Sequence, residues 1–355
     1  MAVKLFYKDK HPFGIDISQT GIKLMAIQNN KWTATAFGSI DLDPQKMQIA
    51  LDATQDDDTY LEESVKELVT QRVTGSLPSN HVIIGLPTSR SFSRTFSLPI
   101  KEERNLASAI EVECTQYIPI PLSSLYVDYQ VIERTKEAAT VIMSAIPKSI
   151  VDNAIRACEA AGLRPVMVEP SINAVARILE ATEEGSLATL IVDIGQAYTD
   201  IAVLDKNAIR VTGGIGIGGN TFTLDIAKKL NIALDNAHQL KVLNGLNLSP
   251  KQEKITTALR PSLTRISNEV RKVIRYYSER IDQSSKIEQL VIVGAGSNVP
   301  GIGDYFTNDL VMPARVASPW QKLEFGKFKP PSKQFRPRYI AVAGLASIKY
   351  EELWK

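Results

Sequence analysis

The sequence predicts an α/β protein built of two related lobes that face each other across a cleft. In two segments half a chain apart, an apolar strand ends in an aspartate, Asp16 or Asp193, and a polar turn and a second apolar strand follow. This pattern is typical of a β-hairpin. Two such turns, each with backbone N–H groups and one carboxylate, can bind phosphates while the carboxylates hold a hydrated Mg²⁺. The duplication therefore indicates a nucleotide site.

The composition is that of an ordinary globular protein. With 355 residues, 44% of them hydrophobic and 23% charged, the chain is long enough for about two domains of ~150 residues. A net charge of +2 gives no electrostatic reason to expect a nucleic-acid partner. The sequence contains neither a run of ~18 apolar residues nor the apolar core of a signal peptide. We therefore expect a soluble cytoplasmic protein without a membrane anchor of its own.

The first lobe is expected to open with the hairpin Phe13–Gln28, followed by a strand at Trp32–Ile40. Three aspartates at 56–58 precede a helix predicted for Tyr60–Val73. We interpret them as a charge cluster at a helix N-terminus, where carboxylates interact favourably with the helix dipole, rather than as a cation site. A buried strand, His81–Pro87, ends at a proline.

After this strand the order of expected strands and helices changes, which predicts a small α+β domain inserted at residues 89–167. Its expected elements are a strand, a helix, two strands and a helix, at Ser91–Leu98, Glu102–Gln116, Leu125–Arg134, Ala138–Ile146 and Lys148–Ala161. A strand at Arg164–Glu169 and a helix at Ser171–Glu180 lead the chain back to the first lobe. The first lobe is then assigned residues 1–88, 168–186 and 335–355.

The second lobe, residues 187–334, again begins with strands and continues with helices. Strands are expected at Leu187–Ile194, Tyr198–Leu204 and Ala208–Val211, helices at Asn220–Leu230, Asp235–Leu243 and Pro250–Asp282, and a strand and turn at Gln289–Asn298 before a helix from Pro300. The basic, proline-rich segment Lys322–Arg338 is expected to be an exposed loop. A final helix is predicted for Tyr339–Leu353.

Two glycine-rich turns of the second lobe suit a close approach of backbone to a ligand. The first has the spacing G-x-G-x-x-G at Gly214, Gly216 and Gly219, which dinucleotide-binding loops share. That alternative requires the first strand of a parallel βαβ unit, whereas hairpin-linked strands precede this turn. The second turn, Gly294 to Ser297, leaves room for a flat adenosine. A Walker-type loop does not occur in the sequence.

The order of these turns resembles that of the actin, sugar kinase and heat-shock chaperone ATPase superfamily over nearly the whole chain. The correspondence runs from the Asp16 turn through Glu169 and the Asp193 turn to the glycine turns. The inserted domain resembles that of the FtsA-like branch, and the run Glu111–Pro121, followed by Asp128, is similar to the PilM family of type IV pilus assembly proteins. The resemblance implies an actin-like two-lobed ATPase fold with a small α+β domain inserted in the first lobe.

The resemblance also implies roles for individual residues. ATP or ADP would be bound by Asp16, Ser18, Lys23, Asp193, Gly195, Thr199, Gly218, Gly219, Lys241, Gly294, Gly296 and Ser297. Asp16 and Asp193 would hold Mg²⁺ through water, Lys241 would lie against the adenine, and Glu169 would orient water as the catalytic residue. The sequence alone also allows Lys23 and Lys241 to be surface lysines and Glu169 to be a helix entry residue. The two aspartates differ, because an aspartate between isoleucines needs a partner for its charge.

The resemblance to this family implies a cytoplasmic protein that is located at the inner membrane through its partner. The expected partner is the N-terminal peptide of a PilN-like inner-membrane protein, bound in a groove by the inserted domain. The nucleotide would be a conformational ligand, with at most slow hydrolysis. The resemblance also allows contacts with other pilus ATPase or platform components, and self-association. The alternatives are an FtsA-like division or filament protein, a small-molecule kinase of the same superfamily and, from another class, a dehydrogenase.

Overall fold

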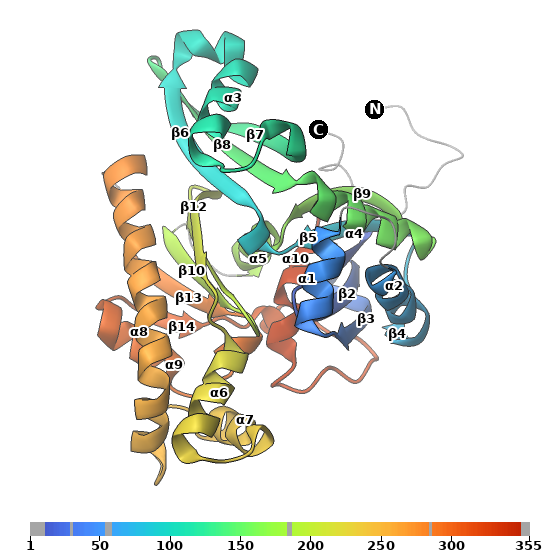
Figure 1. Cartoon of the computed structure of the whole chain (residues 1–355), viewed down its shortest axis with the longest axis vertical. Coiled ribbons are helices and arrows are strands. Elements are labelled where there is room, and N and C mark those ends of the chain that lie inside the picture. Colours follow the sequence, from blue (N-terminus) through green and yellow to red (C-terminus); the bar gives the residue numbers. More distant parts are fainter. Residues whose placement is uncertain (1–10, 29–30, 54–58, 183–186, 284–285, 349–355) are drawn as a thin grey trace.

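Two α/β lobes and a smaller third unit make up the computed structural model of this protein (Figure 1). The third unit stands above the junction of the lobes in the view of Figure 1. The structure describes residues 11–28, 31–53, 59–182, 187–283 and 286–348. Within these ranges, none of the helices is long and apolar enough to cross a bilayer.

The first lobe is built on a six-stranded sheet with the order β4-β3-β2-β1-β5-β9. Its strands are β1 (Phe13–Ser18), β2 (Gly21–Gln28), β3 (Thr33–Asp41), β4 (Val73–Gly75), β5 (His81–Leu86) and β9 (Arg164–Pro170). β1 to β4 are antiparallel, whereas β5 pairs in parallel with both β1 and β9. One face packs against α1 (Pro44–Asp52), α2 (Tyr60–Gln71) and α4 (Lys148–Ala160).

The second lobe has a five-stranded sheet with the order β12-β11-β10-β13-β14. Its strands are β10 (Thr189–Ile194), β11 (Thr199–Asp205), β12 (Ala208–Ile215), β13 (Gln289–Val293) and β14 (Ala314–Val316). A continuous apolar core joins the outer face of this sheet to α6 (Gly219–Leu230), α7 (Leu234–Leu243), α8 (Gln252–Tyr276) and α9 (Ile302–Leu310). α8 continues into a short π-helical turn at Tyr277–Ile281.

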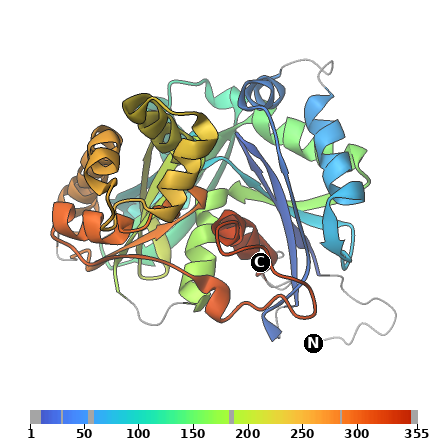
Figure 2. The same ribbon diagram turned by 90° about the horizontal axis from the view of Figure 1, so that it is seen from below.

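Two helices, α5 (Ser171–Thr182) and α10 (Ile340–Ala346), lie between the two sheets, as the green and red helices at the centre of Figure 2 show. The core around them includes Met25 and Ile83 from the first sheet and Ile191 from the second. The two helices cross closely at Gly344, where any Cβ would collide with the backbone of Ala174. Both sheets therefore pack against this pair of helices.

The inserted unit is a three-stranded sheet with the order β6-β8-β7, covered by α3 (Leu106–Tyr117). Its strands are β6 (Phe92–Pro99), β7 (Leu125–Arg134) and β8 (Ala138–Pro147). The helix α4, which the sequence analysis placed in the insertion, packs into the first lobe. The strand β9 also belongs to this lobe, as expected for the segment that leads the chain back to it. Ile150 and Ala154 of α4 are fully buried in its core, and β9 pairs with β5. This packing supports an insertion that ends at Pro147, and the domain limits remain a proposal.

Some local elements differ from the expectations. α1 was not predicted, although Asp43 caps it by accepting hydrogen bonds from the next helical N–H groups. The short strands β4 and β14 were also not predicted, because three residues give no readable alternation. The acidic residues 56–58 and the end of the predicted final helix, 349–355, lie outside the described residues.

Candidate functional site

The two predicted hairpins have the same register in their sheets. In β1–β2, Asp16 stands opposite Lys23, and in β10–β11, Asp193 stands opposite Asp200. Each first strand also pairs in parallel with a neighbouring strand, β5 or β13. The two predicted aspartates therefore occupy equivalent positions in the two lobes, and Asp200 occupies the position that Lys23 has in the first.

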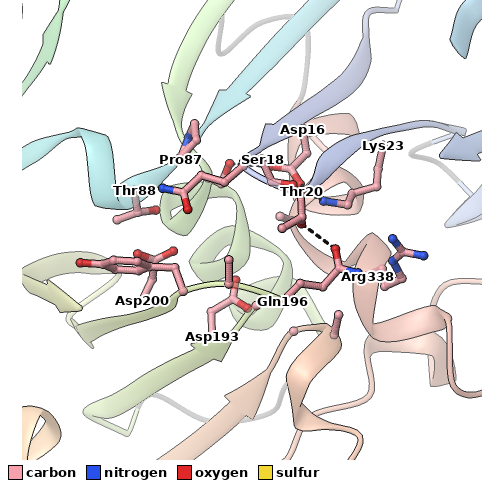
Figure 3. Close-up of a pocket in the computed structure, with 18 of the residues that line it drawn as sticks. Asp16, Ser18, Thr20, Lys23, Pro87, Thr88, Asp193, Gln196, Asp200 and Arg338 are labelled. Atoms are coloured by element: carbon pink, nitrogen blue, oxygen red, sulfur yellow. Dashed lines mark hydrogen bonds and ion pairs between the residues drawn. The ribbon is translucent and has the colours of Figure 1, made fainter. Parts of the chain in front are cut away.

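The turns of these hairpins face each other across a pocket between the lobes, as Figure 3 shows. Thr20 of the first turn donates a hydrogen bond of 2.6 Å to the side-chain oxygen of Gln196 in the second turn. Thr88, Ser171 and Arg338 line the same pocket from three other parts of the chain. The pocket thus joins both lobes, the interlobe helix α5 and the segment before α10.

The first turn holds a buried polar network around Asp16 and Lys23, which are 6% and 7% exposed. The Lys23 Nζ atom donates to Ser18 Oγ at 2.7 Å and lies 3.4 Å from Asp16 Oδ2. Ser171 Oγ donates to the other carboxylate oxygen of Asp16 at 2.6 Å. Lys23 is therefore a buried cation beside the cleft, and the alternative of a surface lysine is wrong.

Asp193 and Asp200 are the least compensated charges of the pocket. Burial and the nearby Asp16 raise the pKa of Asp193 to about 7, with an opposing effect of Lys23. Burial and the charges of Asp193 and Asp16 raise the pKa of Asp200 well above its usual range. Within the described residues, the buried Asp200 Oδ1 atom has no hydrogen-bond partner. A hydrated cation near these groups would favour their ionised forms.

These carboxylates fit a water-mediated Mg²⁺ better than a direct metal site. No three acidic, histidine or cysteine side chains in the described ranges are close enough to bind a metal ion together. Mg²⁺ commonly keeps several waters and uses one or two carboxylates together with phosphate oxygens. The Mg²⁺ role predicted for Asp16 and Asp193 stays a prediction that this geometry allows, and Asp200 is a further acceptor that the sequence analysis did not identify.

The predicted adenosine turn packs tightly under the second hairpin. Gly294 has a φ of +88°, and a Cβ there would collide with the Asp193 carboxylate. A Cβ on Gly296 would lie 2.5 Å from the Ile194 side chain. The Ser297 hydroxyl is buried and donates to the Gly294 carbonyl at 2.7 Å. Gly294 lines the pocket, whereas Gly296 and Ser297 shape the turn from behind.

The predicted glycines of the second lobe hold α6 against the second hairpin. The Gly219 N–H donates to the Gly195 carbonyl at 2.9 Å. A Cβ on Gly218 would lie 2.6 Å from the Gln196 carbonyl oxygen, so only glycine fits without displacement. Gly195 lines the pocket, whereas Gly218 and Gly219 support its turn.

Thr199 and Lys241 make contacts other than those expected. Thr199 is fully buried, and its hydroxyl donates to the Ile217 carbonyl at 2.7 Å, away from the pocket. Lys241 is 5% exposed and donates to the Gly219 carbonyl at 2.7 Å and to Thr223 Oγ1 at 2.8 Å. Burial lowers the pKa of Lys241 to about 8. Lys241 is therefore no surface lysine, and its ammonium group stabilises the start of α6.

Glu169 does not lie in this pocket. Both of its carboxylate oxygens accept hydrogen bonds of 2.8 Å from the Arg177 guanidinium, which also donates to the Gly344 carbonyl. The sequence analysis missed Arg177, which lies in α5, whereas Glu169 lies in the preceding strand β9. This bidentate pair corrects the water-orienting role expected for Glu169, because its oxygens are engaged outside the cleft.

A second, larger groove lies beside the inserted unit. Its volume is about 700 Å³, and Glu169 and Arg177 form part of its wall. Strands β7 and β8 line one side, β9 and α5 line the other, and the β11–β12 hairpin closes it with Leu204 and Ile209. The groove therefore has walls from the inserted unit and from both lobes.

The fold and the cleft together define an actin-like protein. The chain is similar to a chain of the solved PilM-PilN type IV pilus biogenesis complex, with 23% identity, a TM-score of 0.77, and coverage of 95% of this chain and 97% of that one. It is also similar to MreB 5 of Spiroplasma citri bound to AMPPNP, with 14% identity, a TM-score of 0.52 and 95% coverage of each chain. These similarities confirm the predicted actin-like fold.

Within this class, residues 14–349 match the family of the type IV pilus assembly protein PilM, and the chain belongs to that family. Among curated proteins it is similar to the cell division protein FtsA of Borreliella burgdorferi, 26% identical over 189 residues, which are 48% of this chain and 45% of that protein. FtsA of Enterococcus faecalis is 23% identical over 335 residues, 82% of this chain and 74% of that protein. The first relative is thus matched over about half its length. The predicted family is confirmed.

Proposed function

We propose that this protein binds a nucleotide and a peptide from a membrane protein as a component of type IV pilus assembly. The observation that carries the proposal is the groove of about 700 Å³ next to the inserted unit, which is separate from the cleft between the hairpin turns. One site can then take the nucleotide while the other takes the peptide.

The proposed ligand of the cleft is ATP or ADP with Mg²⁺. The carboxylates of Asp16, Asp193 and Asp200 support a hydrated cation, and Lys23 supports a phosphate near the first turn. The AMPPNP-bound MreB 5 of the same fold is consistent with this ligand. Hydrolysis is slow at most, because the bidentate pairing of Glu169 with Arg177 removes the expected water-orienting group.

The proposed partner is the N-terminal peptide of a PilN-like inner-membrane protein. Among the described strands, β7 and β9 are each the last strand of their sheet, and both line the groove. An edge strand offers unpaired N–H and C=O groups to an extended peptide, and alternate side chains of that peptide can enter pockets. The similarity to the PilM-PilN complex supports the same choice of partner.

The lining of the groove suits a peptide with apolar and basic residues. Tyr126 and Tyr129 of β7 belong to this lining, and they are 48% and 43% exposed. Glu169 and Arg177 neutralise each other, so Asp128 and Glu180 leave the lining with a negative charge. We propose that the protein is cytoplasmic and that the membrane protein carrying this peptide holds it at the inner membrane.

A peptide-binding measurement tests this proposal. The variant Asn173→Trp introduces a large side chain on the groove face of α5, whereas Asn268→Trp makes the same change at an exposed position of α8. We expect a fluorescent PilN-like N-terminal peptide to bind Asn173→Trp at least tenfold more weakly than the wild type and the control. Equal affinity for all three proteins would reject this groove.

The FtsA relatives favour a second candidate, an FtsA-like filament protein that binds membranes directly. A liposome comparison separates the two functions. If the wild type binds bare anionic liposomes tightly and has no affinity for the peptide, the FtsA-like function is correct. Self-association and contacts with other pilus components remain further proposals for this family member.

A further inference from the structure

We propose that Arg338 binds a phosphate group of the nucleotide in the cleft. This inference rests on the proposed nucleotide binding and extends it to a residue that the sequence analysis placed in an exposed basic loop. The structure instead buries the Arg338 side chain, which is 8% exposed, in the segment directly before α10. Figure 3 shows Arg338 among the side chains that line the pocket.

Among the described residues that line this pocket, Arg338 is one of two basic ones, and acidic residues outnumber them. Three lining residues are acidic, Asp16, Asp193 and Asp200, and two are basic, Lys23 and Arg338. The pocket is therefore net negative when all five are charged, which opposes the entry of a polyphosphate. The Lys23 ammonium already interacts with Asp16 and Ser18. Arg338 is thus the second cation that a phosphate can meet in this pocket.

The hydrogen bonding of Arg338 leaves a donor for a ligand. Its Nη2 group pairs with Asp41 at the end of β3, an aspartate that is itself 64% exposed. The buried Nε–H group has no acceptor among the described residues. Burial also lowers the pKa of Arg338. A buried guanidinium with an unused donor is costly unless an acceptor is supplied, and phosphate oxygens are well suited to that planar donor.

A purely structural explanation is the main competitor. The Asp41 pair and the hydrogen bond from the Tyr339 hydroxyl to Ser39 both attach this segment to β3. In that case Arg338 would stabilise the fold, and its loss would weaken the binding of every ligand that needs the folded cleft. Phosphate binding predicts instead an effect that depends on the number of phosphates in the ligand. The two explanations are therefore separable by a series of ligands.

The experiment measures the binding of ADP, AMP and adenosine to the full chain, with ADP and Mg²⁺ followed by calorimetry and the weaker ligands by competition. The variants are Arg338→Ala, Arg338→Lys and Arg338→Gln, and circular dichroism checks their folding. The control is Arg336→Ala, which removes a neighbouring arginine that donates to Pro331 and does not line the pocket.

We expect Arg338→Ala to weaken ADP binding tenfold to a hundredfold, as for the loss of a hydrogen bond from a charged group, and to change adenosine binding less than threefold. Arg338→Lys should recover part of the ADP affinity, and the control should bind as the wild type does. If Arg338→Ala fails to fold, the lysine and glutamine variants carry the same comparison.

Three results would overturn the inference. Unchanged ADP affinity in a folded Arg338 variant would reject the phosphate contact while the proposed nucleotide binding stands. Equal losses for ADP and adenosine would make Arg338 a structural residue. Absence of nucleotide binding by the wild-type protein would reject the proposed cleft ligand, and this inference with it.

Discussion

At the scale of single residues, the cleft is defined by acidic groups that the protein neutralises only in part. Asp16 has Lys23 and Ser171 as partners, whereas Asp200 keeps a buried oxygen without a donor in the described part of the chain. Such an arrangement lowers the stability of the free protein and favours the binding of a cation with its phosphates. Stability and function thus place opposite demands on these residues.

Asp193→Asn tests this conflict through its pH dependence. Because the folded-state pKa of Asp193 is raised to about 7, the folded protein binds more protons than the unfolded chain between pH ~4 and that value. Its stability therefore falls as the pH rises through this range and stays reduced above it. We expect nucleotide-free Asp193→Asn to be more stable than the wild type at pH 8 by ~1 kcal/mol, or about 2–4 °C in Tm, with a smaller gain at pH 5.

The same variant should bind ADP with Mg²⁺ about tenfold more weakly, because a neutral amide replaces a carboxylate near the cation. The exposed Asp304 serves as the control, and Asp304→Asn should change neither property appreciably. A melting temperature of Asp193→Asn that does not exceed the wild-type value at pH 8 would contradict the proposed burial cost. Thermal melts and calorimetry at the two pH values provide both measurements.

At the scale of the elements, the position of each strand in its sheet decides what it can bind. The central strands β1 and β10 are paired on both sides, and they hold Asp16 and Asp193 rigidly at the cleft. The outer strands β7 and β9 line the groove and can accept a peptide. The inserted unit supplies one of these edges and the first lobe supplies the other, so neither unit forms the groove by itself.

Two deletions test where the inserted unit ends. Removal of residues 92–147, with a short Gly/Ser linker in their place, leaves α4 and β9 in the first lobe. We expect that protein to fold and bind ADP, and to lose the peptide. Removal of 89–167 also deletes the buried face of α4, including Ile150 and Ala154, and should prevent cooperative folding.

Circular dichroism melts and ADP titrations distinguish these outcomes. If the longer deletion melts cooperatively and binds ADP, α4 and β9 are dispensable for the first lobe and the domain limits predicted from the sequence are correct. If the shorter deletion is folded but binds no nucleotide, the inserted unit contributes to the cleft itself.

At the scale of the whole molecule, the second lobe lines both the cleft and the groove. Strand β11 begins next to Asp200 in the cleft and ends at the hairpin that closes the groove with Leu204 and Ile209. Glu133 of β7 lies 4.0 Å from Lys206 and 3.9 Å from Arg210, which connects the inserted unit to the same hairpin. A movement of the second lobe on nucleotide binding would therefore displace one wall of the groove.

This arrangement predicts that the nucleotide and the peptide affect each other's affinity. We expect ADP with Mg²⁺ to change the peptide Kd by about fivefold or more, and the peptide to change the ADP Kd by the same factor, because binding linkage is reciprocal. Glu133→Gln should bring that factor closer to one. Glu67→Gln, which removes a surface ion pair with Arg72, is the control. Independent binding of the two ligands to the wild-type protein would contradict the coupling.

Local patterns were sufficient to predict most of the elements and the two central aspartates. An apolar strand, a polar turn and a second apolar strand form a hairpin from short-range information, and the repeat of that pattern implied two lobes. The glycine turns were read from the sequence in the same way, and the family resemblance then supplied the role of Lys23. Asp200 could have been found in the same way, since the hairpin register places it where Lys23 stands in the first lobe.

What the sequence by itself determined is the α/β class, the duplicated hairpins and the order of the turns, because each depends on neighbours within a few residues. The tertiary structure alone decided which side chains share a site. It paired Glu169 with Arg177, directed Lys241 to the Gly219 carbonyl and buried Arg338 in the cleft. It also packed α4 into the core of the first lobe. These outcomes depend on how lobes distant in sequence pack and exclude water, and local periodicity does not carry that information.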